Sequence, residues 1–181
     1  VMSDFQTLMS SVASTTDKNR YSVNVDDTWL QGRTAFGGLS AALVVAAMNK
    51  QVAADRRLRA LSVLFVGPVP AGKHEIQLRE LRVGGSVSHL QGELICGDEV
   101  ALSASAAYGK DRSSDIKLAG PEMPAVGDPE LLAQLPYIEG LTPAFTQHFD
   151  MRMEYGEMPF SGADSADFGI WLRFPRPRDI D

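Results

Sequence analysis

Apolar and polar residues alternate over several short stretches in the first half of the chain, and this period of two predicts β-strands. Residues 21–25 alternate strictly. In residues 74–83 the apolar positions change phase near Arg79 or Glu80, which predicts a β-bulge there. After the first strand, the pattern predicts four more, at 60–66, 74–83, 86–96 and 99–108.

Glycines and prolines separate these strands. Gly84-Gly85 and Gly97-Asp98 are two-residue hairpin signals. Residues 67–72 contain two prolines, which cannot continue a strand ladder, so this segment is predicted to be a turn. These short connections predict that the last four strands form an antiparallel meander.

One helix is expected to form the centre of the fold. Residues 39–48 are apolar on nearly every helical face and rich in small side chains, which is typical of a buried helix. A shorter amphipathic helix is predicted at 5–13. Because the sheet needs an apolar cover on one face, we expect an α+β fold in which the antiparallel sheet wraps around the helix at 39–48.

The second half of the chain has a different composition. Residues 110–144 are rich in Pro, Gly, Asp and Glu and predict a linker, with a short helix possible at 129–135. Alternation then returns in residues 149–155 and 168–174, which predict two strands. Two strands alone are marginally stable, so they must pair with the first unit, with another chain, or with residues outside this sequence.

The composition excludes several classes of protein. The 181 residues carry 17 Lys and Arg against 23 Asp and Glu, a net charge of −6, which argues against nucleic-acid binding. The densest basic run, Arg56 to Arg59, is interpreted as a solvated corner between a helix and a strand, or as a contact for a phosphorylated small molecule. No apolar run approaches the roughly 20 residues of a membrane span, and no secretion leader is recognised. The single cysteine, Cys96, excludes an internal disulfide and favours the cytoplasm.

Candidate chemistry gathers around a glycine pair. Gly37 and Gly38 precede the central helix, where free N–H groups and the positive end of the helix dipole can polarise a carbonyl or bind an anion. The alternative is that the glycines only fit a tight turn. Nearby, Trp29, Phe36 and, on a later strand, Phe65 could line an acyl tunnel, and Arg33 could meet a phosphate. Alternatively, the aromatic residues are core and Arg33 pairs with an aspartate of the preceding turn.

Other reactive residue types give no site. His74, His89 and His148 lie far apart and show no metal-ligand spacing, so they are expected on the surface or on strands without a special role. Among them, His89 is the candidate worth testing. Cys96 has no basic neighbour in sequence and is expected to be an inert thiol.

Two segments carry a resemblance to a known family. Trp29 to Leu39 (WLQGRTAFGGL) and Leu61 to Gly72 (LSVLFVGPVPAG) resemble double hot-dog thioesterases of the acyl-CoA thioesterase II-like family. The similarity runs from about Tyr21 onward. It implies a tandem double hot-dog fold, with a first unit at 1–109, a linker at 110–145, and the start of an incomplete second unit at 146–181.

The resemblance also implies a function. The family cleaves acyl-CoA thioesters to a free acid and CoA without a metal or cofactor, with Gly38 N–H as the oxyanion donor here and Trp29, Arg33, Phe36, Gly37 and Phe65 as substrate contacts. Its catalytic Asp lies on the second unit's helix, after Asp181, so no acid or base is assigned in this chain.

Two other functions stay open. The first is a non-catalytic acyl-CoA-binding or structural hot-dog protein. A hot-dog hydratase is less favoured, because no Asp is followed by a His before the central helix. Exposed sheet edges predict a homo-oligomer.

Overall fold

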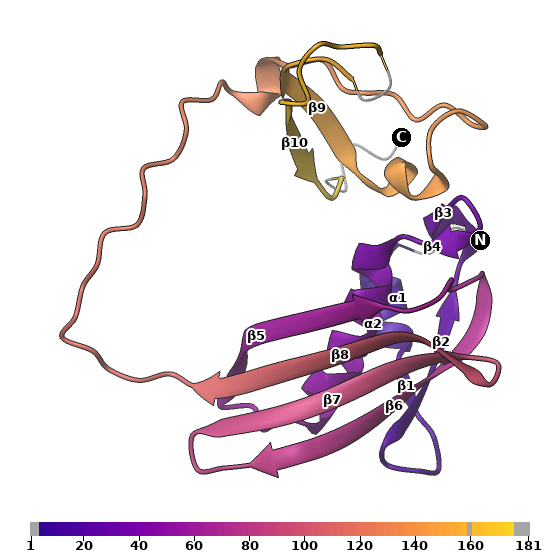
Figure 1. Cartoon of the computed structure of the whole chain (residues 1–181), viewed down its shortest axis with the longest axis vertical. Helices are drawn as coiled ribbons and strands as arrows, with labels where there is room; N and C mark the ends of the chain where they lie inside the picture. Colours follow the sequence, from indigo (N-terminus) through magenta and orange to yellow (C-terminus); the bar gives the residue numbers. More distant parts are fainter. Residues whose placement is uncertain (1–3, 159–160, 176–181) are drawn as a thin grey trace. The chain divides into compact units, whose positions relative to one another are not determined.

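The computed structural model describes residues 4–158 and 161–175, and the chain divides into two compact units, Val1–Ser114 and Asp115–Asp181. The first unit contains a six-stranded sheet in the order β1-β2-β6-β7-β8-β5, in which all neighbours are antiparallel (Figure 1). Its strands are β1 (Ala13–Ser14), β2 (Arg20–Val25), β5 (Arg56–Phe65), β6 (Gly72–Val83), β7 (Val87–Cys96) and β8 (Glu99–Lys110).

The local features of the meander are confirmed. Strands β6, β7 and β8 pair as consecutive hairpins through the predicted glycine turns, with Gly97 at φ 64°. The bulge predicted in β6 is present, since the pairing with β7 shifts register between Glu80 and Arg82. Alternate residues of β8 are buried, namely Leu102, Ala104, Ala106 and Tyr108.

The prediction that β5 lies next to β6 in the meander is wrong. Strand β5 pairs with β8 at the far edge of the sheet, whereas β6 pairs with β2. The reason lies in the connection after β5. Val69 is buried there, its N–H donates to Thr34 Oγ1 at 2.9 Å, and its carbonyl accepts from Ala35 N–H at 2.7 Å. Anchored in this way, the segment carries the chain away from β5 instead of folding back as a hairpin.

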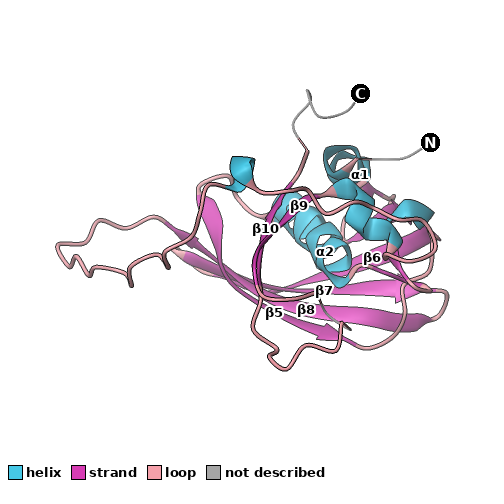
Figure 2. Cartoon of the chain, turned by 90° about the horizontal axis from the view of Figure 1, so that it is seen from above, coloured by secondary structure: helices cyan, strands magenta, loops and turns pink. Residues whose placement is uncertain are grey.

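Helix α2 (Gly37–Gln51) lies along one face of the sheet (Figure 2). Its buried face consists of Leu39, Ser40, Leu43, Val44, Ala47 and Met48. The prediction of burial on all sides is wrong for the opposite face, where Ala41, Ala42, Val45 and Ala46 are half-buried. The sheet covers one face of the helix, and small residues form the other.

The helix approaches β7 closely at Gly92. A Cβ atom built on this glycine would lie 2.7 Å from Val44 Cγ1 and 2.9 Å from Met48 Cε, both on α2. It would also lie 2.8 Å from Leu78 Cδ2 on β6. These separations are shorter than van der Waals contact, so the helix can pack at this depth only because residue 92 has no side chain.

A buried hydrogen bond also joins the helix to the sheet. Tyr108 on β8 is 1% exposed, and its hydroxyl donates to Asn49 Oδ1 near the end of α2 at 2.9 Å. Burial raises the pKa of Tyr108 to about 12, so the phenol stays protonated and remains a donor at physiological pH. This bond fixes the carboxyl-terminal half of α2 over β8.

Short elements connect β2 to α2. They comprise a 3-10 turn, η1 (Asp27–Trp29), and a small hairpin of β3 (Leu30–Gln31) and β4 (Thr34–Ala35). The hairpin turns at Gly32 with φ 67°, a conformation that favours glycine. The sequence analysis did not predict this hairpin. The amino-terminal helix α1 (Phe5–Ser11) is confirmed and is capped by the Asp4 side chain, which accepts from Thr7 N–H.

In the second unit, the two predicted strands are present as β9 (Asp150–Tyr155) and β10 (Gly169–Arg173), and they pair antiparallel with each other. Two 3-10 turns precede them, η2 (Pro129–Leu131) and η3 (Ala144–His148). Part of the segment predicted as linker packs on β9, because Leu135 N–H donates to the Met151 carbonyl at 2.7 Å.

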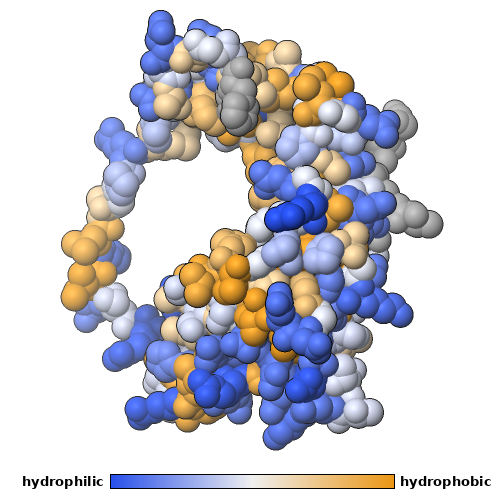
Figure 3. Space-filling view, turned by 45° about the vertical axis from the view of Figure 1, so that its right-hand side comes forward, coloured by the Kyte–Doolittle hydropathy of each residue, from blue (hydrophilic) through white to orange (hydrophobic). Residues whose placement is uncertain are grey.

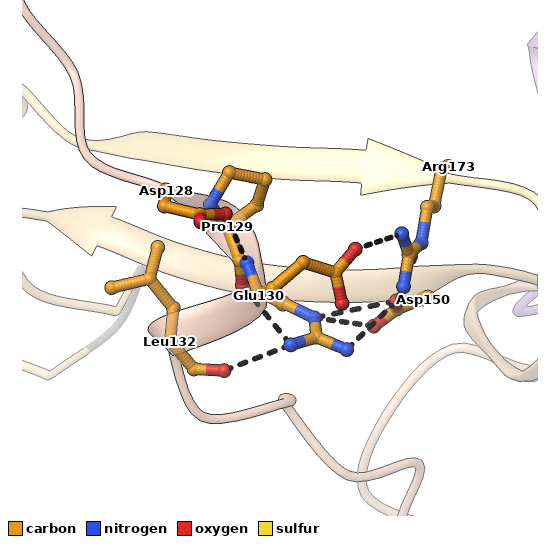
Figure 4. Close-up of polar contacts among 7 residues, drawn as sticks. Asp128, Pro129, Glu130, Leu132, Asp150 and Arg173 are labelled. Carbon is orange, nitrogen blue, oxygen red and sulfur yellow. Dashed lines mark hydrogen bonds and ion pairs between the residues drawn. The ribbon is translucent and has the colours of Figure 1, made fainter.

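A buried carboxylate fastens this unit together. Asp150 is 4% exposed and contacts Arg152 Nε at 3.1 Å and Arg173 Nη2 at 2.7 Å (Figure 4). Arg173 also donates to Glu130 Oε1 at 2.6 Å. The hydrogen bonds from Arg152 and then Arg173 hold the pKa of Asp150 below its ordinary value. Arg152 Nη1 donates to the carbonyls of Pro129 and Leu132, which ties η2 to the strand pair.

Replacing Gly92 by alanine should destabilise the first unit by about 1–3 kcal/mol, the usual cost of overpacking a core. Urea unfolding of the full chain, followed by fluorescence, measures the change. Gly85→Ala is the matched control, since a Cβ there meets nothing within 4 Å, and it should change stability by less than about 0.5 kcal/mol. Equal effects of the two substitutions would contradict the proposed depth of packing.

Asp150→Asn should loosen the second unit, because two arginines lose their charged acceptor. We expect hydrogen exchange of the β9 and β10 amides at pH 7 to rise about tenfold. Since the pKa of Asp150 is lowered by folding, its contribution is complete above the unfolded value of about 3.9 and fades as pH falls through the folded value. The difference from wild type should therefore vanish in strong acid. Asp164→Asn, an exposed control in the same unit, should leave exchange unchanged.

Candidate functional site

The amino terminus of α2 presents free backbone donors. The Phe36 carbonyl accepts from the N–H groups of Leu39 at 2.9 Å and Ser40 at 3.2 Å. Within residues 4–158 and 161–175, no acceptor is found for the N–H of Gly37 or Gly38. Gly38 is exposed and Gly37 is half-buried, so these two donors lie at the positive end of a 15-residue helix within reach of a ligand.

Two aromatic rings flank the glycines. A Cβ built on Gly37 would lie 3.1 Å from Cε1 and Cζ of Phe65, and one on Gly38 would lie 2.5 Å from Cε1 of Phe36. The absence of side chains therefore lets both rings lie against the start of the helix. The structure thus brings together four of the predicted site residues, Phe36, Gly37, Gly38 and Phe65, although Phe65 comes from a distant strand.

The other two predicted residues lie in different surroundings. Trp29 is 1% exposed, its ring lies 6.1 Å from that of Phe5, and its carbonyl accepts from Phe36 N–H. Trp29 is therefore a core residue, which is the alternative that the sequence analysis left open. Arg33 is exposed on the turn between β3 and β4, and no ion pair to it is found among the described residues.

An apolar strip extends from this site along β5. Residues opposite one another in the sheet share a face, and Leu61, Val63 and Phe65 lie opposite the buried Ala106, Ala104 and Leu102 of β8. These three side chains therefore point to the side of the sheet that carries α2. Leu61 is 40% exposed and Phe65 is 60% exposed, and hydrophobic areas are visible on the surface of the first unit in Figure 3.

The arginines at the start of β5 contact neighbouring residues. Arg57 and Arg59 both pair with Asp111, and Arg56 Nη2 donates to the Gly84 carbonyl at 2.7 Å. Hydrogen bonds from Lys110 and Arg59 hold the pKa values of Asp55 and Asp111, respectively, below their ordinary range. These paired carboxylates are therefore poorly suited to act as bases near neutral pH.

The histidines and the cysteine do not form a reactive cluster. In the described part of the chain, no group of three His, Cys, Asp or Glu residues could hold a metal ion. His89 is exposed on β7, and His74 Nε2 lies 2.7 Å from the Pro70 carbonyl oxygen. The expectation of a surface or strand position is wrong for His148, which is buried at the end of η3. Burial raises the pKa of the Cys96 thiol, which fits an unreactive cysteine.

The Asp150 cluster, which the sequence analysis missed, is structural. The cavity beside it measures only about 50 Å³ and is lined by Asp150, Arg152 and Arg173 together with Pro129, Trp171 and Leu172. The two carboxylates and two guanidinium groups of the cluster form ion pairs with one another, so none of these charges is available to a substrate. Asp150 and Arg152 are two residues apart on one strand and so share a face, a signal that could have identified the pair from the sequence.

A family model matches the part of the chain that contains the glycine pair. Residues 25–109 match the family model of the acyl-CoA thioesterase N-terminal domain. No curated protein matches this chain. Within the described residues, none of the helices is long and apolar enough to cross a membrane.

Solved structures show the fold. A hot-dog protein of unknown function from Alicyclobacillus acidocaldarius superposes with a TM-score of 0.80 at 22% identity, covering 96% of this chain and 63% of that one. Acyl-CoA thioesterase II from Mycobacterium marinum gives a TM-score of 0.68 at 18% identity, covering 91% and 58%. A tesB protein from Mycobacterium avium subspecies paratuberculosis gives 0.65 at 17% identity, covering 84% and 54%.

The chain therefore spans less than two thirds of the length of each of these proteins. The matched residues contain β5 to β8, α2 and the glycine pair. Residues 25–109 match the model of the acyl-CoA thioesterase N-terminal domain, and the unit that contains them has the hot-dog fold.

Proposed function

We propose that this protein takes part in the hydrolysis of acyl-CoA thioesters to a free acid and CoA. The observation that carries the proposal is the exposed Gly38 N–H at the start of α2, without an acceptor among the described residues, inside a domain of the acyl-CoA thioesterase family. A thioester carbonyl oxygen placed there gains a hydrogen bond that strengthens as negative charge develops on the oxygen.

The reaction needs a nucleophile as well as this donor. Water attacks the carbonyl carbon and gives a proton to a carboxylate base, and the new C–O bond forms as the oxygen becomes an oxyanion. The C–S bond then breaks, and the CoA thiolate recovers the proton. The family resemblance locates the base on the helix of a second unit, and we assign no residue of this chain to that role.

Substrate contacts follow from the surroundings of the donor. We assign the acyl chain to the surface formed by the Phe36 and Phe65 rings and the strip along β5, where burial of apolar groups favours binding. The guanidinium of Arg33, which forms no ion pair with the described residues, is available to a CoA phosphate. Trp29 holds the residue before the glycine pair, because its carbonyl accepts from Phe36 N–H, and Gly37 gives Phe65 the space to approach.

A second function is favoured by the pairing of Asp55 and Asp111. Because both are committed to cationic partners, neither is assigned as a base, and the unit could bind acyl-CoA without hydrolysing it. In that case a non-hydrolysable thioether analogue would bind, and no thioester would turn over.

We also propose that the chain forms a homo-oligomer. Strand β5 is the edge of the sheet and carries Leu64 at 65% and Leu61 at 40% exposure, so we assign it to pairing with a second copy of the chain. Residues 146–181 are assigned to the start of a second hot-dog unit and 110–145 to the linker. The cytoplasm, where acyl-CoA is available, is the proposed compartment.

Gly38→Pro tests the oxyanion donor directly, because proline removes the N–H and is tolerated in the first turn of a helix. We expect wild type to release CoA from at least one of a short, a medium and a long acyl-CoA. The proline variant should lower kcat by about 100-fold or more. Thiol release followed with a chromogenic disulfide is the measurement.

Gly38→Ala is the matched control, since it retains the N–H and disturbs only the Phe36 ring, and it should lose far less activity. Thermal unfolding checks that both variants are folded. Equal losses in the two variants would overturn the role of the donor. Absence of turnover in wild type together with binding of the thioether analogue would establish the non-catalytic function instead.

The double variant Leu61→Lys and Leu64→Lys should convert an oligomer to a monomer, because charged side chains block pairing at a sheet edge. Light scattering coupled to size-exclusion chromatography measures the mass. Leu118→Lys, at a position 88% exposed in the second unit, should leave the mass unchanged. A monomeric wild type would contradict the assembly.

A further inference from the structure

A polar groove lies at the opposite end of α2 from the glycine pair. It is formed by residues 14–16, 18, 19 and 21, by Lys50 and Gln51 at the end of the helix, and by Glu80 of β6, and it has a volume of about 500 Å³. We call it the Gln51 groove. Since α2 has 15 residues, the two ends lie about 20 Å apart, and the groove is separate from the proposed thioester site.

The groove is large enough for a small metabolite but unsuited to an acyl chain. Its volume falls in the roughly 300–1,000 Å³ range of small-molecule sites. Among its lining residues, only Tyr21 has a large apolar surface, and the others carry hydroxyl, amide, ammonium or carboxylate groups. Burying hydrocarbon there would leave these groups without water, which costs free energy. The occupant must therefore be polar.

The side chain of Gln51, which lines the groove, carries an acceptor that lacks a donor among the described residues. Gln51 Nε2 donates to the Lys18 carbonyl at 2.9 Å and to Asn19 Oδ1 at 3.3 Å, which fixes the orientation of the side-chain amide. Gln51 Oε1 is buried and has no hydrogen-bond partner among the described residues. A buried acceptor left unpaired is unfavourable, so a ligand hydroxyl that reaches it and donates to it would be favoured.

The charges in the groove define the rest of the ligand. The ammonium groups of Lys18 and Lys50 form no ion pair among the described residues, although both side chains line the groove. The two cations favour an anionic group. Glu80, which is also unpaired in the described part of the chain, is an acceptor for further hydroxyl groups. One carboxylate beside two ammonium groups disfavours a metal ion.

We propose that the Gln51 groove binds a small organic anion rich in hydroxyl groups, for which a sugar phosphate is the simplest representative. The phosphate lies between Lys18 and Lys50, and hydroxyl groups donate to Gln51 Oε1 and Glu80. Because Gln51 also holds the loop at Lys18 and Asn19, ligand binding would stiffen this loop against the end of α2. This proposal does not depend on thioesterase activity.

Titration of the full chain with glucose 6-phosphate, followed by amide NMR and calorimetry, tests the site. We expect shifts centred on residues 14–21, 50, 51 and 80, and affinity at least tenfold higher than for inorganic phosphate or glucose alone. The double variant Lys18→Gln and Lys50→Gln should weaken binding at least tenfold. Lys73→Gln with Lys117→Gln, the same charge change outside the groove, should not.

Gln51→Met tests the hydroxyl contact separately. It should reduce the preference for glucose 6-phosphate over inorganic phosphate while leaving phosphate affinity unchanged. If this variant unfolds, the lysine pair decides the question, because those side chains form no hydrogen bond among the described residues. No binding at millimolar concentration, equal affinity for all three probes, or equal affinity of the two lysine double variants would overturn the proposal. None of these results would bear on Gly38.

Discussion

The contact of α2 with β7 at Gly92 determines the geometry of the first unit. Because residue 92 lacks a Cβ, Val44 and Met48 can lie directly on the strand, and the helix packs closely on the sheet. The Tyr108 hydroxyl then fixes the helix near its end through Asn49. The carboxyl-terminal half of α2 is thereby held at a defined place on the sheet. Since the sheet covers one side of the helix, the small residues on the other side and the apolar side chains of β5 remain partly exposed together.

The features that could be predicted from the sequence are those that depend on neighbours in the chain. The strands β6 to β8 follow from alternation and two glycine turns, and the bulge in β6 follows from a change of phase, because each is a local property. The position of β5 could not be predicted, since its partner β8 lies far along the chain and the intervening loop contains no register signal. The hairpin of β3 and β4 was missed because two-residue strands are too short to show a period.

The same distinction explains the candidate site. The glycine pair could be located because a helix start is a local event, and free donors follow from helix geometry. Phe65 reaches Gly37 because β5 pairs with β8, and this pairing turns the Phe65 side chain to the face of the sheet that carries α2. Sequence could not decide whether Trp29 is core or surface, because its burial depends on contacts with other segments, such as Phe5 of α1. The pairing of Asp150 with Arg173 likewise depends on the register of β9 with β10, which the sequence does not specify.

The two ends of α2 offer different chemistry for a physical reason. At the amino terminus, free N–H groups lie beside aromatic rings, so an uncharged carbonyl attached to hydrocarbon fits there. At the carboxyl terminus the helix dipole is negative, and Lys50 in the last turn compensates it. Lys18 joins Lys50 in the groove because Gln51 holds the Lys18 backbone. The two ammonium groups outnumber the single carboxylate of Glu80 in the groove, and this excess of positive charge is what makes the groove favourable for an anion.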